Sequence, residues 1–119
     1  MSFDWTDYLN LALHLHGQPQ GYGQEAAQRS AASRAYYAAF CHARNYARDR
    51  QGFRPRYNVD DHKNVRAHFR RRQMPRIARK LDSLRQWRND CDYSDTVPNI
   101  TDLVTSAIAE AQQVLRKLT

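Results

Sequence analysis

Apolar residues recur along this chain at the three- and four-residue spacing of helices, and no stretch alternates apolar and polar positions as a β-strand would. A first helix is expected after Asp4, a residue type that caps helices, and before the glycine-rich segment 17–23. A second is expected from near Gln24 to about Arg50, where neither glycine nor proline interrupts the pattern. The pattern predicts an all-α fold, an antiparallel up-and-down bundle of four to five helices in one domain over residues 1–119.

The first two helices carry different apolar faces. The face of the first is broad and made of large side chains, namely Trp5, Tyr8, Leu9, Leu11 and Leu13. The face of the second is mostly alanine, with Ala32, Ala35, Ala39, Ala43 and Ala47. Alanine lets a neighbouring helix approach closely, and the rings of Tyr36, Phe40 and Tyr46 fill the volume that remains. We therefore expect the second helix to be the central one.

Prolines divide the second half of the chain. After a loop at 51–58, a short third helix is expected, and Pro75 then stands at the first position of a fourth. Pro98 interrupts the chain again before a last amphipathic helix that extends to Leu118. The residues that can cap the third and the last helix are Asn58 or Asp60 and Asn99 or Thr101.

One arginine lies on the apolar stripe of the fourth helix. The stripe has a 4-3-4-3 spacing and consists of Ile77, Leu81, Leu84, Arg88 and Cys91. Arg88 can serve as a phosphate ligand or line a dimer cleft. It can equally form a structural ion pair, for which Asp92 at i,i+4 has better helical reach than Asp90.

The chain is strongly basic, and the excess is concentrated in one segment. It has 19 Lys and Arg against 12 Asp and Glu, a net charge of +7. From Arg44 to Arg88 there are fifteen Lys and Arg against four Asp. Such a segment favours a polyanionic partner, because each neutralised phosphate releases counterions, although a solvated basic surface gives the same composition. Folded around Pro75, the run Arg70, Arg71 and Arg72 can form a basic ridge.

Other classes of site find little support. No apolar run approaches the roughly 20 residues of a membrane span, and the N-terminal residues are acidic where a signal peptide is basic, so we expect a cytoplasmic protein. Cys41 and Cys91 follow no metal-binding spacing and are expected to be buried free thiols. His14 and His16, two residues apart, do not face one metal from a helix. We expect no metal and no cofactor.

Two segments resemble the signature segments of the HEPN domain family. They are RSAASRAYYAAF, from Arg29 to Phe40, and LRQWRNDCDY, from Leu84 to Tyr93; the pair Asp61-His62 is also similar to the family. The resemblance implies a helical bundle that pairs as a homodimer and is often encoded beside a minimal nucleotidyltransferase. Members of the family act as nucleotide-binding partners or as metal-independent RNases.

This sequence departs from the RNase motif of that family at one position. The matching residues are Arg88, Asn89 and, in the histidine position, Tyr93. Imidazole suits proton transfer from the ribose 2′-hydroxyl because its pKa lies near neutrality, whereas a phenol, with a pKa of about 10, is a poor general base. Asn89 is rotated by about 100° from Arg88 on a helix. We therefore expect these residues to share one cleft only if the helix end unwinds or a second copy contributes.

Neighbouring side chains extend the candidate site. Arg34 and Tyr37 lie on the second helix, where they can meet the Arg88 segment, although an arginine there more often extends to the surface. His62 or His68 can replace the missing histidine from outside the motif. The aromatic residues Phe53, Tyr57 and Trp87 can stack on bases or close an end of the bundle. We expect nucleotide or nucleic acid to contact Arg34, Tyr37, Arg70, Arg71, Arg72, Arg85, Arg88 and Asn89.

Three functional hypotheses follow from the sequence. The first is a dimeric HEPN module that binds RNA, nucleotide or a nucleotidyltransferase partner and lacks efficient catalysis. The second is a metal-independent endoribonuclease of a toxin-antitoxin or defence system. The third is a basic helical adaptor for an acidic protein, which the salt dependence of RNA binding distinguishes from the first.

Overall fold

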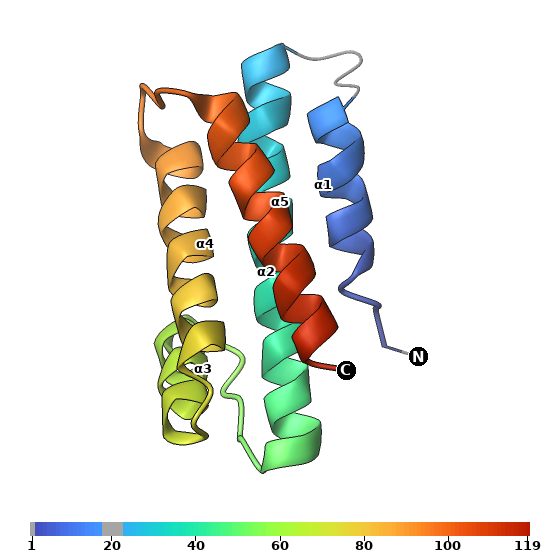
Figure 1. Cartoon of the computed structure of the whole chain (residues 1–119), viewed down its shortest axis with the longest axis vertical. Helices are drawn as coiled ribbons and strands as arrows, with labels where there is room; N and C mark the ends of the chain where they lie inside the picture. The colour runs from blue at the N-terminus through green and yellow to red at the C-terminus, as the bar shows by residue number, and fades with distance from the viewer. Residues whose placement is uncertain (1, 18–22) are drawn as a thin grey trace.

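A computed structural model describes residues 2–17 and 23–119 of the chain. These residues form five α-helices (Figure 1), namely α1 (Asp7–Gly17), α2 (Gln24–Gln51), α3 (Asp60–Arg71), α4 (Pro75–Tyr93) and α5 (Ile100–Lys117). No strand occurs among the described residues. The predicted all-α fold is confirmed, the expected limits of the second helix agree with α2 to within one residue, and α4 begins at Pro75 as expected.

Helices α1, α2, α4 and α5 run alternately up and down, as predicted. In Figure 1, α1 and α4 run upward and α2 and α5 downward, while the short α3 lies behind the start of α4 at the lower end. The long α2 packs against every other helix. It therefore forms the centre of the bundle, and any side chain on it can meet residues from a neighbouring helix.

Alanine explains the central position of α2. Ala31, Ala35, Ala38 and Ala39 are fully buried, and the ring of Tyr36 is buried among them. Small side chains let α4 and α5 approach the α2 backbone, so that the larger side chains of those helices fill the space between. These larger core residues are Leu81, Leu84, Val104, Val114 and Leu118. Each buried Val or Leu stabilises the fold by roughly 1.5–3 kcal/mol relative to an exposed one.

The helix ends use some of the expected caps. Oδ1 of Asp4 accepts the N–H of Thr6 at 3.0 Å, just before α1, and Oδ1 of Asn58 accepts the N–H of Asp60 at 3.0 Å. Both side chains satisfy N–H groups that a helix start leaves free. Asn99 instead adopts the left-handed conformation, with φ 53°, and its side chain makes no capping hydrogen bond to α5. Its role is to turn the chain.

The broad apolar face expected for the first helix is narrower in the structure. Leu9 and Ala12 are buried, but Leu11 and Leu13 are 42% and 43% exposed. The reason is that α1 packs on α2 and α5 along one side alone, so the remaining leucines of its pattern lie outside the core. Of these, Leu11 lines a hollow together with residues of α2.

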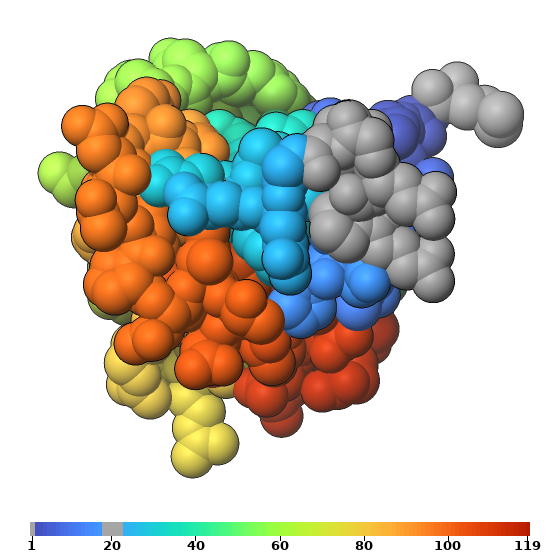
Figure 2. All heavy atoms as spheres, turned by 90° about the horizontal axis from the view of Figure 1, so that it is seen from above, coloured from blue at the N-terminus to red at the C-terminus, as the bar shows by residue number. Residues whose placement is uncertain are grey.

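Arg29 on α2 fixes the end of α4. Its Nη1 donates to the carbonyl oxygens of Cys91 (2.9 Å) and Ser94 (2.6 Å), and its Nη2 donates to that of Asp95 (3.2 Å). Figure 2 looks onto this end of the bundle and shows the α4–α5 connection beside the first turns of α2. Because the last carbonyls of a helix have no partner within it, Arg29 acts as a C-terminal cap supplied by another helix.

The two cysteines are free and buried, as predicted. Burial raises the pKa of both thiols to about 11, so neither is a reactive thiolate at neutral pH. None of the described helices has the length and apolar character of a membrane span.

Candidate functional site

Arg88 lies on α4 between the buried residues Leu84 and Cys91, and 17% of its side chain is exposed. Its guanidinium carbon is 5.3 Å from the ring centroid of Tyr37 and 5.9 Å from that of Tyr36, both on α2. The electron-rich faces of these rings stabilise a cation that has lost much of its water. This is the physical reason why an arginine is tolerated on the apolar stripe.

Only part of the hydrogen-bonding capacity of Arg88 is used. Nη1 donates to Oδ1 of Asn89 at 2.8 Å, and Nη2 donates to the hydroxyl of Tyr37 at 2.9 Å. Nε lies 3.0 Å from Oδ2 of Asp92 without the geometry of a hydrogen bond, so this contact is an ion pair alone. A guanidinium carries five N–H groups. One N–H on each Nη is therefore left without a partner among the described residues.

Asn89 and Tyr93 meet Arg88 without unwinding of α4, which corrects the expectation from helical angles. The helix continues through Tyr93, whose ring centroid is 6.0 Å from the guanidinium carbon of Arg88. The arginine side chain is long enough to reach Asn89 and Tyr93, although these residues lie in other directions around the helix axis. The three residues of the motif therefore lie together in a single chain.

His62, in the first turn of α3, brings an imidazole to this arginine. Its Nδ1 is hydrogen-bonded to the hydroxyl of the buried Tyr36, and its ring stacks on Phe40 with centroids 4.3 Å apart. Burial lowers the pKa of His62, and the positive charges of three arginines, Arg85 first among them, lower it further. The ring is therefore neutral at pH 7, and its Nε2 remains for a ligand.

Two more arginines surround the same histidine. Nη1 of Arg66 donates to the carbonyl of His62 at 2.9 Å, and its Nε lies 3.6 Å from the carboxylate of Asp82. Burial, followed by the charge of Arg85, lowers the pKa of Arg66. Arg85 makes no ion pair with any residue in the described ranges. We call this set the Arg88 cluster: Tyr36, Tyr37, His62, Arg66, Arg85, Arg88, Asn89, Asp92 and Tyr93.

A groove of about 480 Å³ adjoins the Arg88 cluster and shares Tyr37 and His62 with it. Arg34 also lines this groove, with its guanidinium carbon 4.7 Å from the ring centroid of Tyr8 and 5.5 Å from that of Tyr37. Arg34 is thus held between two rings at the edge of the site instead of extending into solvent. The predicted meeting of Arg34, Tyr37 and the Arg88 segment is confirmed, with Tyr37 between the two arginines.

Three of the predicted arginines, Arg70, Arg71 and Arg72, lie on a different surface. They are exposed at the end of α3, and Arg76 and Arg79 are exposed nearby at the start of α4. We call these five residues the basic face. The charges of Arg71 and Arg72 act on His68, whereas those of Arg85, Arg88 and Arg66 act on His62. The two regions meet at one point, because the charge of Arg70 acts on Arg66.

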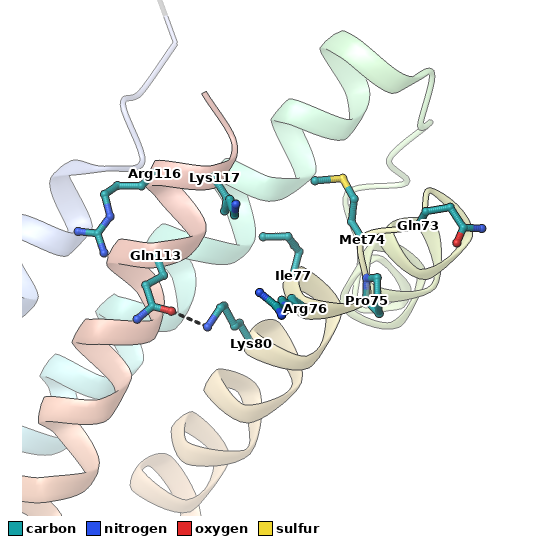
Figure 3. A pocket seen from close by; sticks show the side chains of 9 residues that line it. All are labelled: Gln73, Met74, Pro75, Arg76, Ile77, Lys80, Gln113, Arg116 and Lys117. Atoms are coloured by element: carbon teal, nitrogen blue, oxygen red, sulfur yellow. Dashed lines mark hydrogen bonds between the residues drawn. The ribbon is translucent and has the colours of Figure 1, made fainter.

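A second hollow lies next to the basic face. Figure 3 shows this pocket of about 710 Å³ between the start of α4 and the end of α5, with Arg76, Lys80, Arg116 and Lys117 among its lining residues. Nζ of Lys80 donates to Oε1 of Gln113 at 2.5 Å and to Oε2 of Glu110 at 2.8 Å. The pocket contains no member of the Arg88 cluster.

His68 does not reach the Arg88 cluster. It is buried, its Nε2 pairs with Oε1 of Gln51 at 2.8 Å, and its ring contacts those of Phe53 and Phe69. Phe53 therefore closes an end of the bundle, and Trp87 is likewise packed against the core. Of the two histidines proposed to replace the missing one, His62 alone is in position.

Two features of the site were not predicted. The pairing of Tyr36 with His62 joins residues 26 positions apart, and periodicity alone does not show which ring faces which. The position of Arg66 has a local signal in the sequence, because it follows His62 at i+4 and can reach back along α3.

Comparison with known proteins gave no match: no family model, no curated protein and no solved structure matches this chain. Within residues 2–17 and 23–119, no group of three or more His, Cys, Asp or Glu side chains is arranged to hold a metal ion.

Proposed function

We propose that this protein is a dimeric HEPN-type module that binds RNA or a nucleotide through the Arg88 cluster, without efficient catalysis. The observation that carries the proposal is the state of Arg88, a largely buried guanidinium fixed by tyrosine rings with one N–H on each terminal nitrogen unused. Two parallel N–H groups match the oxygens of a phosphate, and a guanidinium that is already immobilised loses little further entropy on binding.

The surrounding charges support an anionic ligand. Arg66 and Arg85 act on the same histidine as Arg88, so a phosphate beside His62 experiences three positive charges from two helices. The carboxylates of Asp82 and Asp92 are the acidic groups paired with them, at 3.6 Å from Arg66 and 3.0 Å from Arg88. Both Asp side chains are more exposed than the arginines that they pair with. The carboxylate of Asp61 is buried and also acts on His62, but its two oxygens accept the N–H groups of Arg56 and Tyr57.

Weak catalysis follows from the residue at position 93. The Tyr93 side chain is 76% exposed and touches Arg88 by its ring, and a phenol gives almost no phenolate at neutral pH. His62 supports the alternative function of a metal-independent endoribonuclease, because its neutral ring lies within the Arg88 cluster. Its Nδ1 is occupied by Tyr36, however, so any proton transfer at Nε2 depends on that buried phenol.

A homodimer is part of the same proposal. Exposed leucines of α1 and small residues of α2 line a hollow of about 550 Å³ that also includes Arg34 and Asp92, next to the Arg88 cluster. An apolar surface with polar groups at its margin is typical of an interface between copies. The nucleotidyltransferase expected from the family resemblance is a proposed further partner.

The test is the affinity for a labelled single-stranded RNA, measured by fluorescence anisotropy at low salt. Arg88→Ala is expected to weaken binding by about 10- to 150-fold, the range of a lost charge-assisted contact of about 1.5–3 kcal/mol. The control is Arg116→Ala, which removes one exposed arginine of α5 outside the basic face and the Arg88 cluster and is expected to change affinity a few-fold at most. An equal loss of RNA affinity in the two variants would show that Arg88 contributes charge alone. The dimer is tested separately, and a monomer in sedimentation at tens of micromolar would exclude it.

A further inference from the structure

Tyr57 has an unusual backbone conformation and an exposed ring. Its φ is +57°, in the left-handed region that bulky residues rarely adopt, and 61% of the residue is exposed. An exposed tyrosine in that conformation gains nothing from core packing that would offset the strain. Strained residues of this kind concentrate at binding sites.

Asp61 fixes that conformation. The carboxylate is buried, with Oδ1 accepting the N–H of Arg56 at 2.9 Å and Oδ2 accepting the N–H of Tyr57 at 2.8 Å. The hydroxyl of Tyr57 in turn accepts a hydrogen bond from Nη1 of Arg48 at 2.9 Å. The ring is therefore positioned from both ends while its faces stay outside the core.

Tyr57 lines the groove that adjoins the Arg88 cluster. The guanidinium carbon of Arg44 lies 5.1 Å from the ring centroid of Tyr57 and 5.7 Å from that of Trp5, so an arginine and two aromatic rings meet there. Planar cations and aromatic rings are the side chains on which nucleobases stack. Tyr37 connects this wall to Arg88, because it lines the groove and its hydroxyl accepts a hydrogen bond from Nη2 of that arginine.

We propose that this groove is a nucleobase subsite in which a base stacks on Tyr57 while the phosphate of the same nucleotide binds at the Arg88 cluster. The inference rests on the proposed function, since it takes the phosphate position from it. The ligand class is a nucleoside phosphate, free or as a unit of single-stranded RNA. A base within a duplex offers no free face to the ring, so double-stranded RNA is excluded from the subsite.

Tyr57→Asn is the decisive variant. Asparagine adopts the left-handed conformation more readily than tyrosine, so the fold is expected to be at least as stable, while the stacking surface is removed. Binding of AMP and of a short oligoadenylate, measured by titration calorimetry, is expected to weaken by about 5- to 150-fold, the range for one lost base–aromatic stack. Tyr57→Phe keeps the ring and is expected to retain most of the affinity. If AMP binds and the oligoadenylate does not, the site is one for a free nucleotide. If the oligoadenylate binds more tightly than AMP, the site is one for single-stranded RNA.

Ribose 5-phosphate separates this inference from the proposed function. It carries the phosphate without the base, so it is expected to bind weakly to the wild type and equally to Tyr57→Asn. Location is checked in a Trp87→Phe background, where Trp5 is the one remaining tryptophan and AMP is expected to quench its fluorescence. If AMP binds no better than ribose 5-phosphate, or equally to Tyr57→Asn, the base subsite is wrong and the phosphate site stands. If neither ligand nor RNA binds, both proposals fail.

Discussion

The Arg88 cluster and the basic face are both rich in arginine, but they hold it in different ways. In the cluster, Arg88 is packed on tyrosine rings and bonded to Asn89 and Tyr37. On the basic face, Arg70, Arg71 and their neighbours extend into solvent, with no ion pair to any described residue. The same residue type is held by contacts in one region and surrounded by solvent in the other.

This difference predicts that the two regions contribute differently to RNA binding. Exposed charges act over the Debye length, about 8 Å at physiological ionic strength, and are screened by salt, so they attract a polyanion without orienting it. A fixed guanidinium acts at contact distance and selects a particular geometry. We therefore expect the basic face to govern the strength of RNA binding at low salt, and the Arg88 cluster to govern what is bound.

Charge reversal on the basic face is expected to have the largest effect. Wild-type affinity for single-stranded RNA should fall by roughly 10³ or more between 50 and 200 mM salt if several phosphates are contacted. Replacing Arg70, Arg71 and Arg72 together with Glu is expected to abolish binding, with unchanged helical circular dichroism because all three side chains are exposed. Unaltered affinity in that variant would favour the adaptor for an acidic protein.

Cleavage chemistry tests the other region. The wild-type protein is expected not to cleave RNA at a useful rate, since a lost general acid or base typically costs about 10² to 10⁴ in rate. Tyr93→His places an imidazole beside Arg88 and is expected to produce metal-independent cleavage, which Arg88→Ala then removes. Product formation from labelled RNA in the presence of a chelator is the measurement. Strong wild-type cleavage that Arg88→Ala eliminates would instead assign proton transfer to His62.

The two regions also differ in how far the sequence predicts them. The limits of α2, the start of α4 and the position of Arg88 on a buried stripe follow from apolar spacing and from Pro75, which are local signals. The exposed state of the basic face follows from the same spacing. By contrast, the contacts of His62 and Tyr57 depend on how α3 lies against α2, and no periodicity sets the angle between two helices. The broad apolar face predicted for the first helix is wrong at Leu11 and Leu13, which are exposed, because an apolar pattern does not show how many neighbours a helix has.

Arg29 links the α2 scaffold to the Arg88 cluster, and its loss is expected to have a moderate effect on stability. It donates three hydrogen bonds to carbonyl groups on either side of Asp92 and Tyr93, the last two residues of α4. Arg29→Met keeps the aliphatic stem and removes those bonds, so the free energy of unfolding in urea should fall by about 2–3 kcal/mol. Arg79→Met, on the solvent side of α4, is expected to change it by about 0.5 kcal/mol or less. A comparable loss in both variants would show that the carbonyls are satisfied by water.

The smallest effect expected is on two histidine titrations, and it tests whether the charges of one region reach the histidine of the other. Burial and the charges of Arg85, Arg88 and Arg66 lower the pKa of His62, whereas burial and the charges of Arg71 and Arg72 lower that of His68. Arg85→Gln should therefore raise the pKa of His62 and leave that of His68 unchanged. Arg71→Gln should do the reverse.

Proton NMR of the imidazole resonances, assigned with His62→Gln, measures both values. The sign also reaches stability: below about pH 6.5 the unfolded chain binds protons that the folded protein does not, so the free energy of unfolding falls as the pH decreases toward the folded pKa values. His62→Gln is expected to make that fall less steep without removing it, since His68 still titrates. If either arginine variant shifts the pKa of both histidines, the charges of the basic face and of the Arg88 cluster act on the same groups. The basic face would then contribute to ligand selection as well as to attraction.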